Sequence, residues 1–480
     1  MESPKTKPKL GQKFHCYGIS FKWTSLHKSA EELNKLVFTY DKLATDTVNY
    51  LQENATSNKD VHGRDLFKLL KDEAEDGGVV GQLWDQVNTV PEWVDWQQIE
   101  RGQKVFWRYV GPALVALGQM SLLGSFGYGR AVRVLDKTGG WKTENTFRRL
   151  LETTQHTLDV HKDLKSLQPG GDGWESSIRV RLLHSSVRRR IMALAREKPE
   201  YYDKIVDGVP INDMDSIITM NDFSSLVMYL GLPRQGIYPS KQEIADYLAT
   251  WRYICYIMGT PDFFLETPES AKAMMESIFL SEVKPDEQAG VISNNMINAL
   301  VGQAPSYASR GFLQAMVYWL NGKEIARSLE IEAPSLYHTS LVAGQCWLFM
   351  LLTYPRRFTP TFIDDRINEA TKKKIYDALV HNKEKGALGY KAKFTFKWIP
   401  ALDFRTPPGD TKADRTKDSG ALKHFGPEAV SIVTLLMTAF SAAGGVWGAF
   451  STAKKFGLLP AWPAWLPEFM LRLAKPTFSP

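Results

Sequence analysis

The spacing of apolar residues is the feature of this sequence that most restricts its fold. From Asp65 onward apolar residues recur at intervals of three and four, as in Leu66, Leu69 and Leu70. This spacing places them on one face of an α-helix. Few segments alternate apolar and polar residues as strands do, and no β-rich block is evident. The chain is therefore predicted to be all-α, a large helical bundle.

The length and the local composition divide the chain. At 480 residues it exceeds the size at which one core stops growing, so one large domain with appendages or two domains are expected. We predict a polar, peripheral N-terminal extension over 1–60 and a helical domain over 61–403. A charged, proline-containing linker is predicted over 404–428, followed by a hydrophobic segment over 429–480.

The composition excludes several classes of protein. Apolar residues make up 44% and charged residues 23%, as in a globular protein. The formal charge of +6 is spread over the chain, which gives no reason to expect a nucleic-acid partner. Cys16, Cys255 and Cys346 are too few and too widely spaced for a disulfide framework or a cysteine metal site. No secretory signal is evident at the N-terminus, and an intracellular, reducing location is expected.

Two uncharged stretches bear on membrane association. Val110–Phe126 contains Gly and Pro and is only 17 residues long, so we predict a buried core helix. Residues 429–450 form 22 residues without a charge, which is long enough to cross a bilayer. Their Ser, Thr and Gly residues make them only moderately apolar. They are compatible with a membrane-associated helix and equally with a helix packed on the main domain.

Two histidines at 156 and 161, close to Asp159 and Asp163, suggest a metal site at first sight. On a helix, residues five apart differ by about 140°, at about 100° per residue. One ion could bind both histidines only across a break in the helix. We therefore predict that His156 and His161 lie on an exposed polar helix face.

One helix carries the most informative residue. A helix from about Glu175 places Val180, His184, Val187 and Ile191 on a single stripe, at spacings of four, three and four. His184 is thus predicted to be buried in an apolar wall.

Two arginines, Arg181 and Arg188, lie one turn before and after His184. A neutral imidazole can bind iron and guanidinium groups can bind carboxylates, so this trio is chemically suited to a haem and its propionates. The alternative for His184 is a hydrogen-bonded histidine of the core.

A second polar set lies on the preceding helix. Arg149, Glu152 and Thr153 occupy positions i, i+3 and i+4, hence one helical face. They could form the polar wall of a pocket or, equally, a simple surface ion pair.

Several blocks resemble, in order, one known family of haem oxygenases, which includes latex-clearing rubber oxygenases and the endoplasmic-reticulum oxygenase of mycophenolic acid biosynthesis. RVRLLHSSVR (179–188) resembles the family's R-x-x-H-x-x-V-R signature. The supporting blocks, from about residue 80 to 400, are VPEWVD (90–95) with RGQKVFWRY (101–109), RRLLET (148–153), GVPINDMDSIITMNDF (208–223) and YLATWRYICYIMG (247–259). In the last block Cys255 stands near the family's usual glycine.

The resemblance implies a fold and a cofactor. Members are all-helical and hold a b-type haem in the middle of the bundle, with the histidine that matches His184 as the iron ligand. The residues that match Arg149 and Thr153 lie in the haem pocket. Where this chain has Glu152, the rubber-cleaving members have a lysine that can cap the iron, so this chain departs from them. The family's distal catalytic glutamate has two candidates here, Asp136 and Glu144.

The resulting hypothesis is a haem b-dependent oxygenase. We expect oxidative C=C cleavage of an apolar, isoprenoid-like or other unsaturated lipid with O2, by Arg149, Glu152 and Thr153, with Arg181, His184 and Arg188 binding the cofactor and His184 the iron. The alternatives are a haem hydroxylase or peroxygenase of secondary metabolism and a non-catalytic, membrane-anchored haem- or lipid-binding protein. An endoplasmic-reticulum location through the C-terminal segment would follow from the resemblance.

Overall fold

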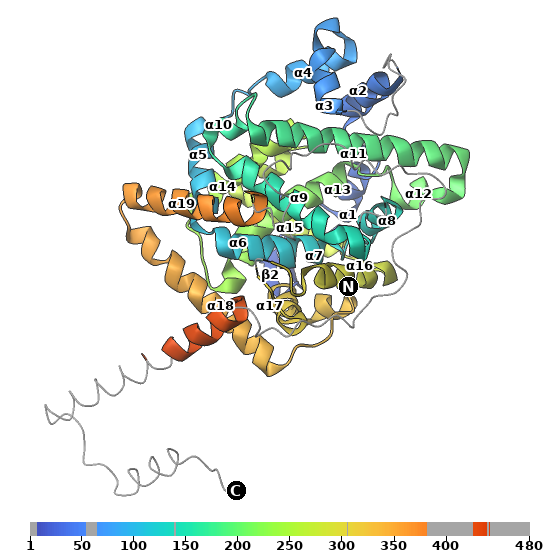
Figure 1. Cartoon of the computed structure of the whole chain (residues 1–480). Coiled ribbons are helices and arrows are strands. Elements are labelled where there is room, and N and C mark those ends of the chain that lie inside the picture. Colours follow the sequence, from blue (N-terminus) through green and yellow to red (C-terminus); the bar gives the residue numbers. More distant parts are fainter. Residues whose placement is uncertain are drawn as a thin grey trace, which may run out of the picture. The chain divides into compact units, whose positions relative to one another are not determined.

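A computed structural model describes residues 7–53, 65–138, 141–304, 306–381, 426–438 and 441. Over these residues the fold is all-α as predicted, apart from one antiparallel hairpin of β1 (Lys13–Cys16) and β2 (Ile19–Lys22) (Figure 1). The helices of the first half are α1 (Ala30–Leu36), α2 (Lys42–Glu53), α3 (Leu66–Asp72), α4 (Gly78–Asn88), α5 (Trp96–Arg108), α6 (Val110–Ala116), α7 (Leu123–Ser125), α8 (Gly129–Thr138), α9 (Thr143–His161), α10 (Leu164–Leu167) and α11 (Asp172–Glu197). Those that follow are α12 (Lys204–Asp207), α13 (Asp213–Phe223), α14 (Lys241–Ile257), α15 (Pro268–Ser281), α16 (Glu287–Leu300), α17 (Arg310–Ser328), α18 (Leu336–Thr353) and α19 (Thr361–Tyr376).

Short helical turns of other kinds connect these elements. The 3₁₀ turns are η2 (Ala74–Asp76), η4 (Pro199–Tyr201), η6 (Pro233–Gln235), η7 (Phe263–Leu265) and η8 (Pro355–Phe358). The π-helical segments are η3 (Leu117–Leu122), η5 (Val227–Gly231) and η9 (Asp377–His381).

The described N-terminal residues pack into the main core, whereas the sequence predicted a peripheral extension. Leu33 of α1 and Val48 and Leu51 of α2 are fully buried in the same core as the later helices. The polar composition of 1–60 gives no sign of these buried residues, because an outer helix needs only one apolar stripe to join a core. Residues 7–53 therefore belong to the main unit, which extends to Ser431.

Long helices packed against one another form the frame of the core. The helix α5 lies along α14, and α11 packs against both α2 and α9 (Figure 1). Glycine permits the closest approach, since a Cβ at Gly102 of α5 would overlap the main-chain carbonyl of Asp246 on α14. Gly173 plays the same part at the start of α11, where it lies against the backbone of Asp159 and Val160 on α9. The contact at Gly173 lets α9 and α11, the two predicted site helices, approach closely.

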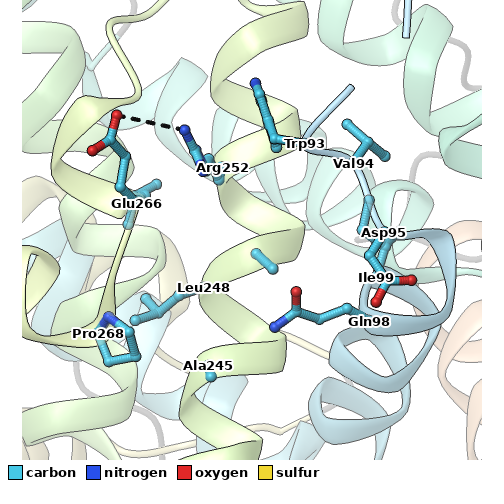
Figure 2. A pocket seen from close by; sticks show the side chains of 12 residues that line it. Trp93, Val94, Asp95, Gln98, Ile99, Ala245, Leu248, Arg252, Glu266 and Pro268 are labelled. Atoms are coloured by element: carbon cyan, nitrogen blue, oxygen red, sulfur yellow. Dashed lines mark ion pairs between the residues drawn. The ribbon is translucent and has the colours of Figure 1, made fainter. Parts of the chain in front are cut away.

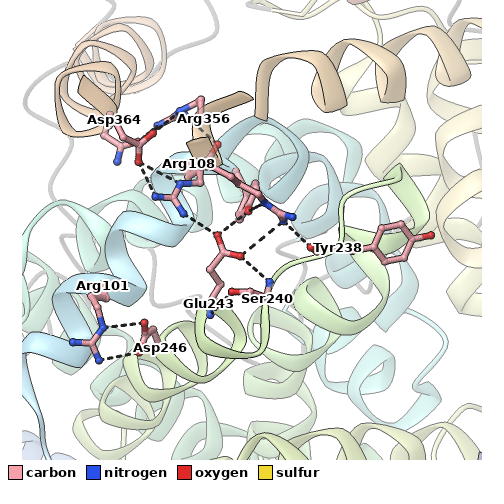
Figure 3. A network of polar contacts seen from close by, with 11 residues as sticks. Arg101, Arg108, Tyr238, Ser240, Glu243, Asp246, Arg356 and Asp364 are labelled. Atoms are coloured by element: carbon pink, nitrogen blue, oxygen red, sulfur yellow. Dashed lines mark hydrogen bonds and ion pairs between the residues drawn. The ribbon is translucent and has the colours of Figure 1, made fainter. Parts of the chain in front are cut away.

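A polar network joins α19 to the core (Figure 3). Arg108 of α5 donates to Glu243 of α14 at 2.8 Å and to Asp364 of α19 at 2.9 Å. Asp364 also accepts from Arg356 at 2.8 Å, and Arg101 pairs with Asp246 at 3.0 Å. Buried carboxylates are thus matched by guanidinium groups, as burial of charge requires.

The stretch 110–126 is a buried core helix, as predicted, although not a regular one. It runs from α6 through the π-helical η3 into α7, and Val110, Ala113, Met120 and Leu123 are buried. The π segment was not predicted from the sequence. It shifts the helical register before Leu122, and such segments are frequent at functional sites.

Part of the C-terminal region can be described. Residues 427–438 are helical, and Glu428 accepts a hydrogen bond from the Ser309 backbone N–H at 2.7 Å. Within the described residues no helix is both long enough and apolar enough to span a bilayer. Most of the predicted linker and most of 429–480 lie outside the described residues.

Candidate active site

Four of the six sequence-predicted site residues meet at a cavity of about 280 Å³, namely Arg149, Glu152, Thr153 and His184. Its wall is built mainly from η3, α7, α8, α9, α11 and α13, with one residue of α14 and two of the turn after it. Most of the wall is apolar. The apolar lining residues are Leu122, Ala131, Val134, Leu135, Trp141, Val180, Leu183, Val187, Ile211, Ile218, Met220, Phe223, Trp251 and Met258. An apolar cavity with a few polar groups is the usual form of a small-molecule site.

His184 lies on the cavity wall between Val180 and Val187 of the same helix, α11. Its imidazole has no hydrogen-bond partner among the residues that the structure describes. Burial lowers the pKa of His184 to about 4, helped by repulsion from Arg188, Arg149 and His156. At neutral pH the ring is therefore uncharged, and one nitrogen has a lone pair free to bind a metal ion.

Arg149, Glu152 and Thr153 also lie on this wall, brought there by α9. Glu152 accepts from Arg149 at 3.3 Å and from Arg148 at 3.0 Å. From the sequence these residues could form either an ion pair or the polar wall of a pocket. In the structure the Arg149–Glu152 ion pair is itself part of the cavity wall. The Glu152 carboxyl group is thus paired with two guanidinium groups at the edge of the cavity.

Arg181 and Arg188 do not reach the cavity. Arg181 is 2% exposed and forms a two-pronged ion pair with Asp41, the residue just before α2, at 2.6 and 3.0 Å. Arg188 donates to the main-chain carbonyls of Pro210 and Ile211 and to Thr45. Both lie on a different side of α11 from Val180, Leu183 and Val187, so neither is among the described lining residues, and their role toward a cofactor stays a prediction. His184 lies on α11 between the side that lines the cavity and the side that carries the two arginines.

The two histidines of α9 correct a second prediction. His156 is 7% exposed and His161 is fully buried, so neither lies on a polar surface. They do face different ways, as the spacing predicted. His156 lines the cavity, whereas the ring of His161 stacks between Phe106 and Tyr247, with centroid separations of 4.1 and 5.6 Å. Within the described part of the chain, no cluster of His, Cys, Asp or Glu could form a metal site of three or more ligands.

A polar stripe on α13 was missed by the sequence reasoning. Asp215, Thr219 and Asp222 all line the cavity. Their spacing of four and three was readable as one helical face. Burial raises the pKa of Asp215 to about 7, with Glu282 adding to the rise and Arg130 opposing it. Burial also raises the pKa of Asp222 well above its usual range.

Asp222 gives the first testable prediction, on pH-dependent stability. Its side chain is 3% exposed and neither carboxyl oxygen has a partner among the described residues. Below about pH 4 this group is protonated in the folded and the unfolded chain, and it does not affect stability. Above that pH the unfolded chain loses the proton while burial keeps it on the folded chain, so the native protein loses stability as pH rises.

We expect Asp222→Asn to remove this loss. The free energy of unfolding of the variant should exceed that of the parent by an amount that grows with pH, by at most about 1.4 kcal/mol per pH unit. Urea unfolding at a series of pH values measures it. Asp85→Asn, at an exposed position, is the control and should leave the curve unchanged. A difference that is constant from pH 4 to 8 would show that Asp222 is charged in the folded protein.

Of the two candidates for a distal glutamate, only Asp136 has a described side chain, and it does not line the cavity. Asp136 of α8 accepts a hydrogen bond from Gln288 at 2.8 Å and is not among the lining residues. The side chain of Glu144 lies outside the described part of the structure. The carboxylates on the wall are instead Glu152, Asp215 and Asp222.

A smaller hollow of about 100 Å³ lies between α5 and α14 (Figure 2). Arg252 covers the ring of Trp93 at 4.1 Å and pairs with Asp262 at 3.0 Å and with Glu266 at 3.6 Å. Arg252 is thus paired with two carboxylates. The hollow contains none of the predicted site residues.

The fold and the cavity define an all-helical protein with one buried, largely apolar site that carries histidine and carboxylate groups. The chain belongs to the family of ER-bound oxygenases mpaB/B′ and rubber oxygenases. The catalytic-domain model of that family matches residues 107–350, about half of the chain, and every residue lining the cavity lies within the match.

Comparison with solved structures gives the same fold. The chain is similar to latex clearing protein in its closed state, with a TM-score of 0.54 and 15% sequence identity. The similarity covers 70% of this chain and 90% of the other. No match was found among curated protein sequences.

Proposed function

We propose that this protein is a haem b-dependent oxygenase that uses O2 to cleave a C=C bond of an apolar substrate, isoprenoid-like or another unsaturated lipid. The observation that carries the proposal is His184, a neutral imidazole without a partner among the described residues, on the wall of an apolar cavity. Core histidines normally make hydrogen bonds, because leaving a buried polar group unpaired costs free energy. Membership of an oxygenase family supports the proposal.

The residues present fit a haem in part. His184 would hold the iron, and Val180, Leu183 and Val187 beside it would contact the flat apolar face of the ring. Arg149 is the cation on the described wall, and it would be better placed than Arg181 or Arg188 to pair with a propionate. The haem would supply the iron chemistry that activates dioxygen.

The other residues of the wall would bind and orient the substrate and move a proton. The apolar lining would hold the alkene and exclude water. Glu152 is paired with two arginines, which suits it to orientation rather than to proton transfer. Asp215, with a pKa raised to about 7 by burial, suits a general base, since such a group works best near the pH of the reaction.

The visible spectrum of the purified protein tests the cofactor. A Soret band that shifts on addition of dithionite and then of carbon monoxide is expected. Oxygen consumption with an unsaturated lipid then separates an enzyme from a haem carrier, and product masses separate C=C cleavage from hydroxylation. A colourless protein at full yield, even when haem is added during growth, would contradict the proposal.

Arg149 and Thr153 provide a prediction on turnover. Arg149→Ala and Thr153→Ala should each lower kcat by an order of magnitude or more, because each removes a group that positions molecules in the cavity. Stability should change little, as α9 tolerates alanine well. The matched control is Arg148→Ala on the same helix, which pairs with the same Glu152 but is not on the wall. Equal turnover in all three variants would remove Arg149 and Thr153 from the site.

The hydrophobic C-terminal segment provides a prediction on location. We propose that the residues after 438 mediate membrane association, on the strength of the uncharged run 429–450. Glu428 is bonded to Ser309, so a truncation should end after Thr438, beyond this contact. Full-length protein is expected in the membrane pellet and the truncated form in the supernatant, with its haem. A full-length chain found wholly in the supernatant without detergent would exclude the anchor.

A further inference from the structure

Two histidines of α9 are neutral and buried, and their neighbours determine which ring nitrogen carries the proton. Burial lowers the pKa of His156 to about 4 and that of His161 to about 3. Each ring therefore has a single N–H at neutral pH, and its position follows from the hydrogen bond that the other nitrogen makes.

His161 has its proton on Nδ1. This nitrogen lies 2.8 Å from the main-chain oxygen of Thr157. A carbonyl oxygen only accepts, so Nδ1 must donate, and Nε2 is left bare. No described group donates to that Nε2.

His156 has the opposite arrangement. Its Nδ1 lies 2.8 Å from the hydroxyl of Ser176 on α11. Ser176 is 5% exposed, and among the described residues its hydroxyl has no other acceptor, not even the carbonyl four residues before it. A buried hydroxyl normally donates its hydrogen, so Ser176 donates to Nδ1 and the imidazole proton is on Nε2.

The Nε2–H of His156 has no acceptor among the described residues, although the side chain is 7% exposed and lies on the cavity wall. An unpaired buried donor costs folding free energy, so the acceptor is expected in the contents of the cavity. His156 also contributes by charge repulsion to the lowered pKa of His184, and both side chains line the cavity, one from α9 and one from α11.

We propose that Ser176 holds His156 as the Nε2–H tautomer and that this N–H donates a hydrogen bond to dioxygen in the cavity. The choice of dioxygen rests on the proposed function. Of the two molecules that the reaction needs, an alkene has no hydrogen-bond acceptor, whereas dioxygen becomes a strong one as it gains negative charge. A preorganised donor in a water-poor cavity stabilises such charge. His156 is thereby a catalytic residue, and Ser176 a positioning residue.

The tautomer is tested without any activity. In purified full-length protein labelled with ¹⁵N-histidine, the nitrogen shifts should show a protonated Nε2 and a bare Nδ1 for His156. His161 is the internal control and should show the reverse. Ser176→Ala should change the His156 pattern and leave that of His161 as it was. A protonated Nδ1 at His156 in the parent protein would overturn the assignment.

The role toward dioxygen is tested by two variants of different hydrogen-bonding ability. His156→Leu should raise the KM for dioxygen about tenfold, the usual effect of one lost hydrogen bond, while His156→Gln, which keeps a donor, should recover much of it. The C–O stretching band of carbon monoxide bound to the reduced protein should shift in His156→Leu and much less in His156→Gln. Both variants must first show a parental Soret band.

The outcomes separate the two proposals. Unchanged KM and an unchanged carbon monoxide band in His156→Leu would overturn the role of His156 while the oxygenase assignment stands. A parent protein without haem or oxygen consumption would overturn the oxygenase assignment and the choice of dioxygen. The tautomer experiment would still decide whether Ser176 directs the His156 N–H.

Discussion

His184→Ala is expected to yield a folded protein that retains no haem. The ligand-to-iron bond is the strongest single contact that a b-type haem makes with its protein, because no thioether bond attaches it. In this chain His184 brings an imidazole without a hydrogen-bond partner among the described residues from α11 to the cavity wall. The apolar residues around it would hold a flat ring only by van der Waals contact. Removing the imidazole should therefore abolish the Soret band of the purified protein.

Folding should survive this change, which keeps the experiment interpretable. His184 makes no hydrogen bond with any described residue, so its loss leaves no donor or acceptor unpaired. Alanine is also the best helix former, and α11 is a helix of 26 residues. Far-ultraviolet circular dichroism and the urea midpoint should remain close to those of the parent without haem.

Val187→Ala is the matched control for His184→Ala. Val187 lines the same cavity one turn later on α11, so its replacement removes apolar volume but no nitrogen. This variant should keep its Soret band. Added imidazole should restore haem binding to His184→Ala by entering the space of the lost ring. A full Soret band with an unchanged spectrum in His184→Ala, without imidazole, would mean that another residue binds the iron.

The register of α11 was the part of the site that the sequence could predict. The spacing of Val180, His184 and Val187 is a local property of the helix, and the structure places all three on the cavity wall. The same holds for Arg149, Glu152 and Thr153 on α9. Helical periodicity identifies which residues share a face, and no knowledge of the rest of the chain is needed for that.

Which residues a helix face contacts depends on partners far away in the sequence. A local pattern does not predict those partners. Arg181 lies one turn from His184, but its partner Asp41 directly precedes α2, 140 residues earlier. The neighbourhood of His156 is likewise set by Ser176 on another helix, which buries a histidine that composition placed at the surface. The polar stripe of α13 was readable as a stripe, but its position at the cavity follows only from the packing of α13 against η3.

Arg181→Met is the second substitution with a large expected effect, and this effect is on stability rather than on haem. The guanidinium of Arg181 is 2% exposed and binds both oxygens of Asp41, the main-chain oxygen of Ile257 and the side chain of Gln86. Methionine keeps most of the volume but leaves Asp41 as an unpaired, nearly buried charge. The free energy of unfolding should fall by about 3–5 kcal/mol, as for other broken buried ion pairs.

The partner substitution identifies the origin of that loss. Because the cost of Arg181→Met arises largely from stranding the Asp41 carboxylate, the double variant with Asp41→Asn should be more stable than the sum of the two single losses predicts. Arg181→Lys should recover only part of the stability, since an ammonium group cannot match both carboxylate oxygens at once. Urea unfolding of the four variants and the parent measures these terms. A variant Arg181→Met that unfolds like the parent but loses its Soret band would place Arg181 at the cofactor after all, and would mean that the Asp41 pairing is replaced when haem is bound.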